Sequence, residues 1–168
     1  MGKIISYEKD AREGILKGVI KLARAVKTTL GARGRNVLIE SHDGISAQIT
    51  KDGVTVARAV TLEAPLERIG CNVVKKVALN TNEEVGDGTT TSIVLAEAMM
   101  QEGLKYTDED SLNPISLKRG MDKAVAAVVE YLKQIAIPVD NNIDFIEKIA
   151  TVSANNDSTI GKLIAKAF

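Results

Sequence analysis

The stretch EEVGDGTTTSIVLAEAMM, from Glu83 to Met100, joins a glycine-containing turn to an apolar helix. Gly86 and Gly88 permit backbone conformations that other residues avoid, and they let a ligand approach the main chain closely. The helix that begins near Thr89 presents unpaired N–H groups and the positive end of its dipole, which together suit an anion. Hydroxyl donors stand at the same helix end, on Thr89, Thr90 and Thr91.

Asp87 lies inside this turn, where its negative charge would repel a bare phosphate. A carboxylate in such a place makes sense if Mg²⁺ bridges it to the phosphate oxygens, as happens in many nucleotide sites. The alternative interpretation is that Asp87 and Thr89 only cap a helix. Taken alone, the stretch favours the cap, because helix caps are far commoner than nucleotide sites.

Two further polar turns shift the balance towards a nucleotide site. TLGARGRN follows a predicted helix with another glycine-containing turn, and ITKDGV (Ile49–Val54) puts Lys51 and Asp52 at a strand end. Three such turns could converge on one triphosphate. The sequence has no Walker A pattern, and Gly86-x-Gly88-x-x-Thr91 is only a near miss to the dinucleotide fingerprint.

Composition excludes several classes of partner. The formal net charge is +0, which argues against nucleic acid or an anionic membrane as a bulk partner. Aromatic residues make up 3% of the chain, so stacking platforms for single-stranded nucleic acid are lacking. Cys71 is the only cysteine, which fits a reducing compartment and leaves no disulfide framework or thiolate metal site. Without an apolar leader or an 18-residue apolar run, we expect a cytoplasmic protein.

The hydrophobic pattern predicts a mainly α fold with one small β-hairpin. Apolar residues recur at three- and four-residue steps through most of the chain. Helices are predicted over Glu8–Thr28, Leu66–Asn80, Gly88–Gly103, 114–134 and two shorter segments after Pro138. Strands are predicted at Val37–Glu40 and Ala47–Thr50, joined around Asp43-Gly44.

Some details of these helices can be predicted as well. Gly103 is predicted to end the helix that starts at Gly88 with a left-handed cap. Asn113 is predicted to cap the next helix, with Pro114 at its first helical position. Cys71 is expected to be a small buried hydrophobe. The residues expected to face inward beside it are Ile69, Val73, Val74 and Val77.

The chain resembles the N-terminal part of a group I chaperonin, the bacterial GroEL type. TLGARGRNV, ITKDGV, GDGTTTSIVLAEAM, LKRGMDKAV and VSANND occur in that family's order and together span nearly all of the sequence. The resemblance implies an ATP-hydrolysing, ring-forming chaperone that assists protein folding and binds nucleotide in an equatorial domain. The other function left open is a truncated, non-catalytic oligomerisation or interaction module.

The resemblance also implies a domain organisation. Residues 1–137 would be the first segment of the equatorial domain, a helical bundle with a small β-hairpin. Residues 138–168 would begin the intermediate domain. The apical domain and the C-terminal equatorial segment of the family have no counterpart in these residues.

Site residues follow from the resemblance position by position. Thr29, Leu30, Gly31 and Ala32 match the loop that lines the nucleotide phosphates, although the family usually has proline where Ala32 stands. Lys51 matches a position near the phosphates, where the family also holds K⁺ partly through backbone carbonyls. Asp52 matches a catalytic carboxylate that positions the attacking water. The Mg²⁺ ligand and the phosphate-binding helix start are Asp87, Gly88, Thr89, Thr90 and Thr91.

The partners implied are identical subunits in a ring, together with unfolded polypeptides and a co-chaperonin that bind through the apical domain. The hairpin Val37–Thr50 is expected to make contacts within a ring, because a two-stranded ribbon is marginal alone. The region Lys105–Asp108 is similar to a contact between rings. ATP, Mg²⁺ and K⁺ are the cofactors implied.

Overall fold

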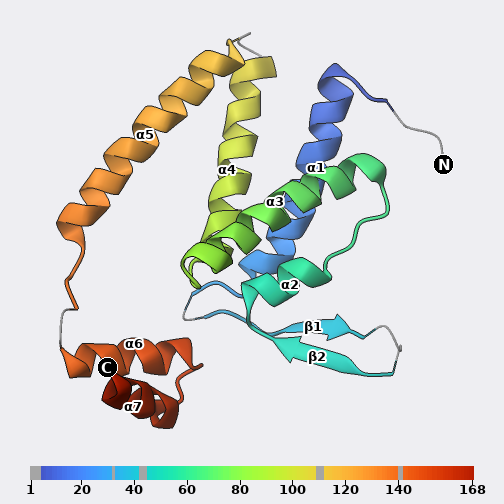
Figure 1. Ribbon diagram of the computed structural model, residues 1–168. Helices are drawn as coiled ribbons and strands as arrows, with labels where there is room; N and C mark the ends of the chain where they lie inside the picture. Colours follow the sequence, from blue (N-terminus) through green and yellow to red (C-terminus); the bar gives the residue numbers. More distant parts are fainter. Residues whose placement is uncertain (1–4, 32, 42–44, 109–111, 140–141) are drawn as a thin grey trace. The chain divides into compact units, whose positions relative to one another are not determined.

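The computed structural model describes residues 5–31, 33–41, 45–108, 112–139 and 142–168. These residues form two compact units, Met1–Leu117 and Lys118–Phe168, and the boundary lies inside helix α5 (Pro114–Ile135). The mainly α fold with one antiparallel hairpin is confirmed (Figure 1). The assignment of residues 1–137 and 138–168 to two domains of the family stays a prediction.

Three long helices build the first unit: α1 (Glu8–Lys27), α3 (Pro65–Glu84) and α4 (Thr89–Asp108). Figure 1 shows α3 lying across α1 and α4, and all three pairs are in contact. The crossing of α1 and α3 is close because each helix offers a glycine there. A Cβ on Gly18 would lie 1.9 Å from the Glu67 carbonyl oxygen, and a Cβ on Gly70 would lie 2.0 Å from that of Ile15.

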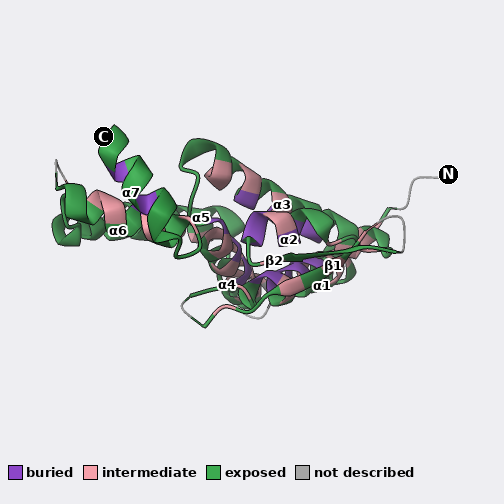
Figure 2. Ribbon diagram, turned by 90° about the horizontal axis from the view of Figure 1, so that it is seen from below, coloured by how far each residue is buried: buried purple, intermediate pink, exposed green. Residues whose placement is uncertain are grey.

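The core of this unit forms where the helices face one another (Figure 2). Its largest fully buried side chains are aliphatic, and Cys71 is buried among them, as expected. Burial raises the pKa of the Cys71 thiol, an effect that the nearby Lys75 ammonium partly opposes. The core consists of Val19, Leu22, Ala23, Val26, Val56, Ala57, Cys71, Val74, Ala78 and Ile93.

The inward face of α3 differs from the predicted one. Val74 is fully buried, but Ile69 and Val73 are about half exposed and Val77 is 37% exposed. The contact at Gly70 explains the difference, because it turns the Gly70–Cys71–Val74–Ala78 side of the helix towards α1. The prediction was therefore wrong for Ile69, Val73 and Val77.

The hairpin and a short helix complete the first unit. Strands β1 (Val37–Glu40) and β2 (Ala47–Thr50) have the predicted bounds and pair antiparallel, whereas the turn at Asp43-Gly44 lies outside the described residues. Helix α2 (Gly53–Ala59) was not predicted. Lys75 of α3 holds its far end by donating to the Arg58 carbonyl at 3.2 Å and to the Val60 carbonyl.

Helix α4 runs five residues past the predicted cap at Gly103, so that prediction was wrong. Gly103 lies inside the helix, and a Cβ there would make only an ordinary 3.5 Å contact with Leu117. At the start of α5, Asn113 Oδ1 accepts a hydrogen bond from the Ile115 N–H at 2.8 Å, which confirms the predicted cap.

The second unit contains most of α5 and a pair of helices, α6 (Ile143–Ser153) and α7 (Ser158–Ala167), which pack on each other. Both helices begin with a side-chain cap. Asn142 caps α6 by accepting a hydrogen bond from the Phe145 N–H, and Asp157 caps α7 by accepting from two of its N–H groups. Within the described residues, α5 has no buried residue. No helix in the described part of the chain is long and apolar enough to cross a membrane.

Candidate functional site

Three turns of the first unit meet at one small hollow of about 240 Å³. One follows α1, one joins β2 to α2, and one joins α3 to α4. The hollow brings together every predicted site residue that the structure describes; Ala32 lies outside the described residues. Its lining is Thr29, Leu30, Gly31, Lys51, Asp52, Gly53, Asp87, Gly88, Thr89, Thr90 and Thr91.

The turn before α4 is shaped by two glycines. Gly86 and Gly88 have φ values of +78° and +79°, a left-handed conformation that side chains disfavour. The Gly88 N–H donates to Asp87 Oδ1 at 2.7 Å, and the Gly88 carbonyl accepts the first intrahelical bond, from the Ser92 N–H at 2.9 Å. The N–H groups in the first turn of α4 therefore have no partner within the helix, and they lie at the end of α4 that lines the hollow.

The turn after α1 is held by its own backbone. The Thr29 hydroxyl donates to the Val26 carbonyl at 2.8 Å, and the Leu30 N–H donates to the Lys27 carbonyl at 3.2 Å. Gly31 then takes a φ of +75°. Across the hollow, Thr29 Oγ1 lies 3.5 Å from Thr90 Oγ1, so the two turns touch through their hydroxyl groups.

Asp52 has a structural role that the sequence analysis missed. It is the N-cap of α2: Oδ2 accepts from the Thr55 N–H at 2.9 Å and from the Thr55 hydroxyl at 2.6 Å, and Oδ1 accepts from the Val54 N–H at 3.4 Å. The preference for aspartate at the N-cap of a helix was the available signal.

The same contacts keep Asp52 ionised. Partial burial would by itself raise the pKa of the carboxyl group, but the hydrogen bonds from Thr55 and Val54 and the charge of Arg58 outweigh it. The net result is a pKa below the usual value. Asp52 is therefore a carboxylate at neutral pH, able to accept a further hydrogen bond.

The charges on the hollow favour a cation together with an anion. Two carboxylates, Asp52 and Asp87, and one ammonium, Lys51, line it, which gives a local charge of about −1 from the ionisable lining groups. A bare phosphate would gain from Lys51 and the start of α4 but would be repelled by the carboxylates. A divalent cation would remove that repulsion.

Asp87 offers the kind of ligand that Mg²⁺ takes in nucleotide sites. In the described part of the chain, no three His, Cys, Asp or Glu side chains lie close enough to form a metal cluster. Mg²⁺ commonly takes one or two carboxylates and completes its shell with water and phosphate oxygens. Asp87 could supply such a carboxylate at the start of α4.

The comparisons with known proteins agree with this fold. A model of the TCP-1/cpn60 chaperonin family matches residues 22–168, and the chain therefore belongs to the TCP-1/cpn60 chaperonin family. The group I assignment within it stays a prediction.

Solved structures support the same relationship. The chain is similar to chaperonin gp146 from the bacteriophage EL 2 (Pseudomonas aeruginosa), crystallised in the presence of ATP-BeFx. In one crystal form the identity is 31% and the TM-score 0.78, with 95% of this chain covered; in another the values are 30%, 0.79 and 96%. The chain spans 28% of the length of gp146 in both.

Proposed function

We propose that the protein is an ATP-dependent, ring-forming chaperone that assists protein folding, and that the hollow is the phosphate and Mg²⁺ side of its ATP site. The observation that carries the proposal is the meeting of three turns, distant in sequence, around one helix start. Membership of the chaperonin family and the crystallisation of gp146 with ATP-BeFx support it. In this proposal residues 1–137 belong to the equatorial domain and 138–168 begin the intermediate domain.

Each lining residue then has a definite task. The first-turn N–H groups of α4 and the hydroxyls of Thr89, Thr90 and Thr91 hydrogen-bond phosphate oxygens. Lys51 balances phosphate charge, and the backbone of Thr29–Gly31 closes the other side. The carbonyls near Lys51 could hold K⁺. Mg²⁺, held by Asp87, would neutralise charge on the phosphates during transfer.

Asp52 is the catalytic residue in this proposal. Its carboxylate is ionised, fixed by the cap contacts with Thr55, and lines the same hollow as Asp87. A fixed carboxylate can accept a proton or hydrogen bond from the water that attacks the terminal phosphate. Its hydrolytic role is distinct from the binding role of Asp87.

The hairpin is the proposed contact between identical subunits. Leu38 and Ile49 are cross-strand partners, and their exposed fractions are 68% and 66%. Paired apolar side chains with this exposure are suited to burial in an assembly. Unfolded polypeptides and a co-chaperonin would bind parts of the protein beyond these residues, in the cytoplasm.

The experiment that tests the nucleotide site is calorimetric titration of the native protein with Mg·ATP. Asp87→Asn should weaken Mg·ATP binding by about tenfold or more, because an uncharged amide is a poorer partner for the cation. Binding of metal-free ATP in EDTA should be no weaker in the variant, because Asp87→Asn also removes a carboxylate that repels bare phosphate. Asp122→Asn, which alters a carboxylate paired with Lys118 on the exposed surface of α5, is the charge-matched control. Equal Mg·ATP affinity in all three proteins would restore the interpretation that Asp87 only shapes a helix start.

A further inference from the structure

Gly53, the first residue of α2, packs closely against the start of α4 and the end of α1. A Cβ at this position would lie 2.0 Å from Thr90 Oγ1, 3.2 Å from Thr90 Cβ and 3.3 Å from Val26 Cγ1. The first distance is far shorter than any side-chain contact allows. Gly53 is also buried, so a side chain there could not turn away into solvent.

The requirement for glycine at this position is steric. Gly31, Gly86 and Gly88 also line or shape the hollow, but each has a positive φ and open space around its Cβ position. Gly53 has an ordinary helical conformation as the first residue of α2. Alanine would therefore suit its backbone, and in a helix alanine is favoured over glycine. The contact with Thr90 is the main obstacle to the substitution, and the 3.3 Å approach to Val26 adds a smaller one.

The neighbours of Gly53 give this contact a consequence for the site. Asp52 precedes it and caps α2, Thr90 belongs to the first turn of α4, and Val26 receives the Thr29 hydroxyl bond. We propose that Gly53 is a positioning residue, whose missing side chain sets the separation between Asp52 on α2 and the phosphate-facing start of α4. This inference rests on the proposed function, because it assigns the separation to nucleotide binding.

The test uses two backgrounds that both lack the Thr90 hydroxyl. Thr90→Ala removes the atom that a Cβ on residue 53 would meet, whereas Thr90→Val keeps an atom of similar size in its place. Any direct contribution of the hydroxyl to nucleotide binding is absent from both. Gly53→Ala is then introduced into each background and into the unaltered protein. In the Thr90→Ala background only the 3.2 and 3.3 Å approaches remain, which small shifts relieve.

We expect Gly53→Ala to weaken Mg·ATP binding about tenfold or more in the unaltered protein and with Thr90→Val, because overpacking forces backbone shifts that would move the start of α4 away from Asp52. With Thr90→Ala the same change should weaken binding less than about threefold. Gly103→Ala, on α4 and in ordinary contact only with Leu117, is the matched control and should change binding by less than about twofold.

Urea unfolding of the same set of variants provides a readout that does not depend on nucleotide. Gly53→Ala should lower the midpoint with Thr90→Val and leave it unchanged or raised with Thr90→Ala. Equal effects of Gly53→Ala in the two backgrounds, on binding or on unfolding, would overturn the inference. A native protein that does not bind Mg·ATP at all would instead overturn the proposed function, and the unfolding data would still decide whether Gly53 sets the spacing.

Discussion

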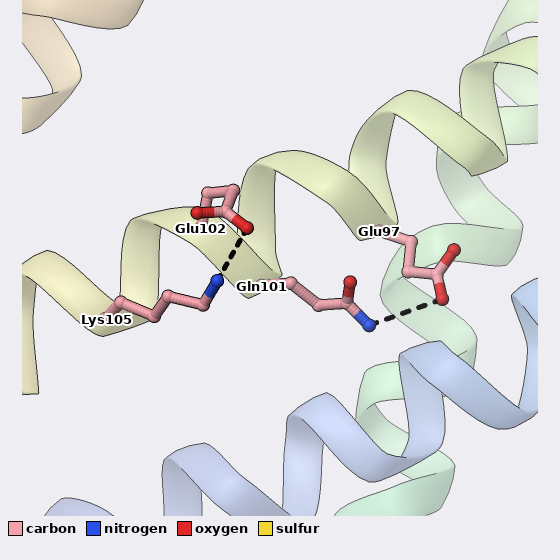
Figure 3. Close-up of polar contacts among 4 residues, drawn as sticks. All are labelled: Glu97, Gln101, Glu102 and Lys105. Carbon is pink, nitrogen blue, oxygen red and sulfur yellow. Dashed lines mark hydrogen bonds and ion pairs between the residues drawn. The ribbon is translucent and has the colours of Figure 1, made fainter.

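Glu97 of α4 and Lys27 of α1 form an ion pair in which the carboxylate is buried and the ammonium is partly exposed. Gln101 adds a weak hydrogen bond to Glu97 Oε1 at 3.4 Å (Figure 3). Lys27 is the last residue of α1, and its carbonyl receives the Leu30 N–H of the first site turn. The pair therefore ties α4 to the end of α1 just before the turn that lines the hollow.

Glu97→Gln should destabilise the protein by about 1–3 kcal/mol, because it leaves Lys27 without its buried partner and places an amide where a charge was compensated. Glu102→Gln is the matched control on the same helix. Glu102 pairs with Lys105 at 2.7 Å in an exposed position (Figure 3), and losing that pair should cost less than about 1 kcal/mol. Urea unfolding measures both losses, provided that the dependence of the unfolding free energy on urea concentration is the same in each protein. Similar losses for the two variants would show that the buried Glu97–Lys27 pair contributes no more to stability than an exposed pair.

Two substitutions of Asp52 should separate its charge from its role as a helix cap. Asparagine keeps a good N-cap, whereas alanine loses the bonds from Thr55 and should cost about 0.5–2 kcal/mol of stability. Under the proposed function, both variants of the native protein should slow ATP turnover on the order of 100-fold while the affinity for Mg·ATP changes little. If Asp52→Asn hydrolyses ATP at the normal rate, the carboxylate acts only as a cap.

The lowered pKa of Asp52 makes a prediction about acid stability. A carboxyl group whose folded pKa lies below its unfolded value of about 3.8 stabilises the fold above that value, and the contribution is lost as the pH falls through the folded pKa. The difference in unfolding midpoint between the original protein and Asp52→Asn should therefore be constant from about pH 5 to 7. Below about pH 3.8 it should shift in favour of the variant. A difference that does not vary with pH would mean that the cap bonds do not depend on the charge.

The strands and most helices could be predicted from local sequence because their signals are local. Two β-branched runs between glycines predicted β1 and β2 with their observed bounds, and Asn113-Pro114 predicted the start of α5. Helix α2 was missed because seven residues give too little periodicity to recognise a face. Which side of α3 faces inward depends on the close approach of Gly18 of α1 to Glu67 and of Gly70 of α3 to Ile15, and no pattern within α3 contains that information.

The candidate site shows the same limit. The resemblance to chaperonins identified residues such as Thr29, Lys51 and Asp87, but local periodicity gives no distance between turns so far apart along the chain. The cap bonds of Asp52 and the contact between Gly53 and Thr90 became visible only once α2 had been placed against α4. Both depend on packing between elements, which propensity and spacing do not specify.

The 168-residue chain on its own should be a poor ATPase that self-associates. Its hollow of about 240 Å³ is smaller than the roughly 300–1,000 Å³ typical of ligand pockets, so it can enclose only part of a nucleotide. Phosphoryl transfer needs positioning from all sides, and an incomplete site should lose most of the rate. On α5, Val125, Val128 and Leu132 follow a helical spacing, and each is more than half exposed. An apolar stripe of this kind promotes association.

Light scattering after size exclusion should therefore show a mass that rises with concentration. Val128→Glu/Leu132→Glu should shift the chain towards the monomer. Lys133→Glu makes the same change of two charges on α5, where Lys133 pairs with Glu130 at the exposed surface, and it should leave the association in place. A monomer at all concentrations, with steady Mg²⁺-dependent turnover that Asp87→Ala abolishes, would show that these residues already form a complete catalytic site.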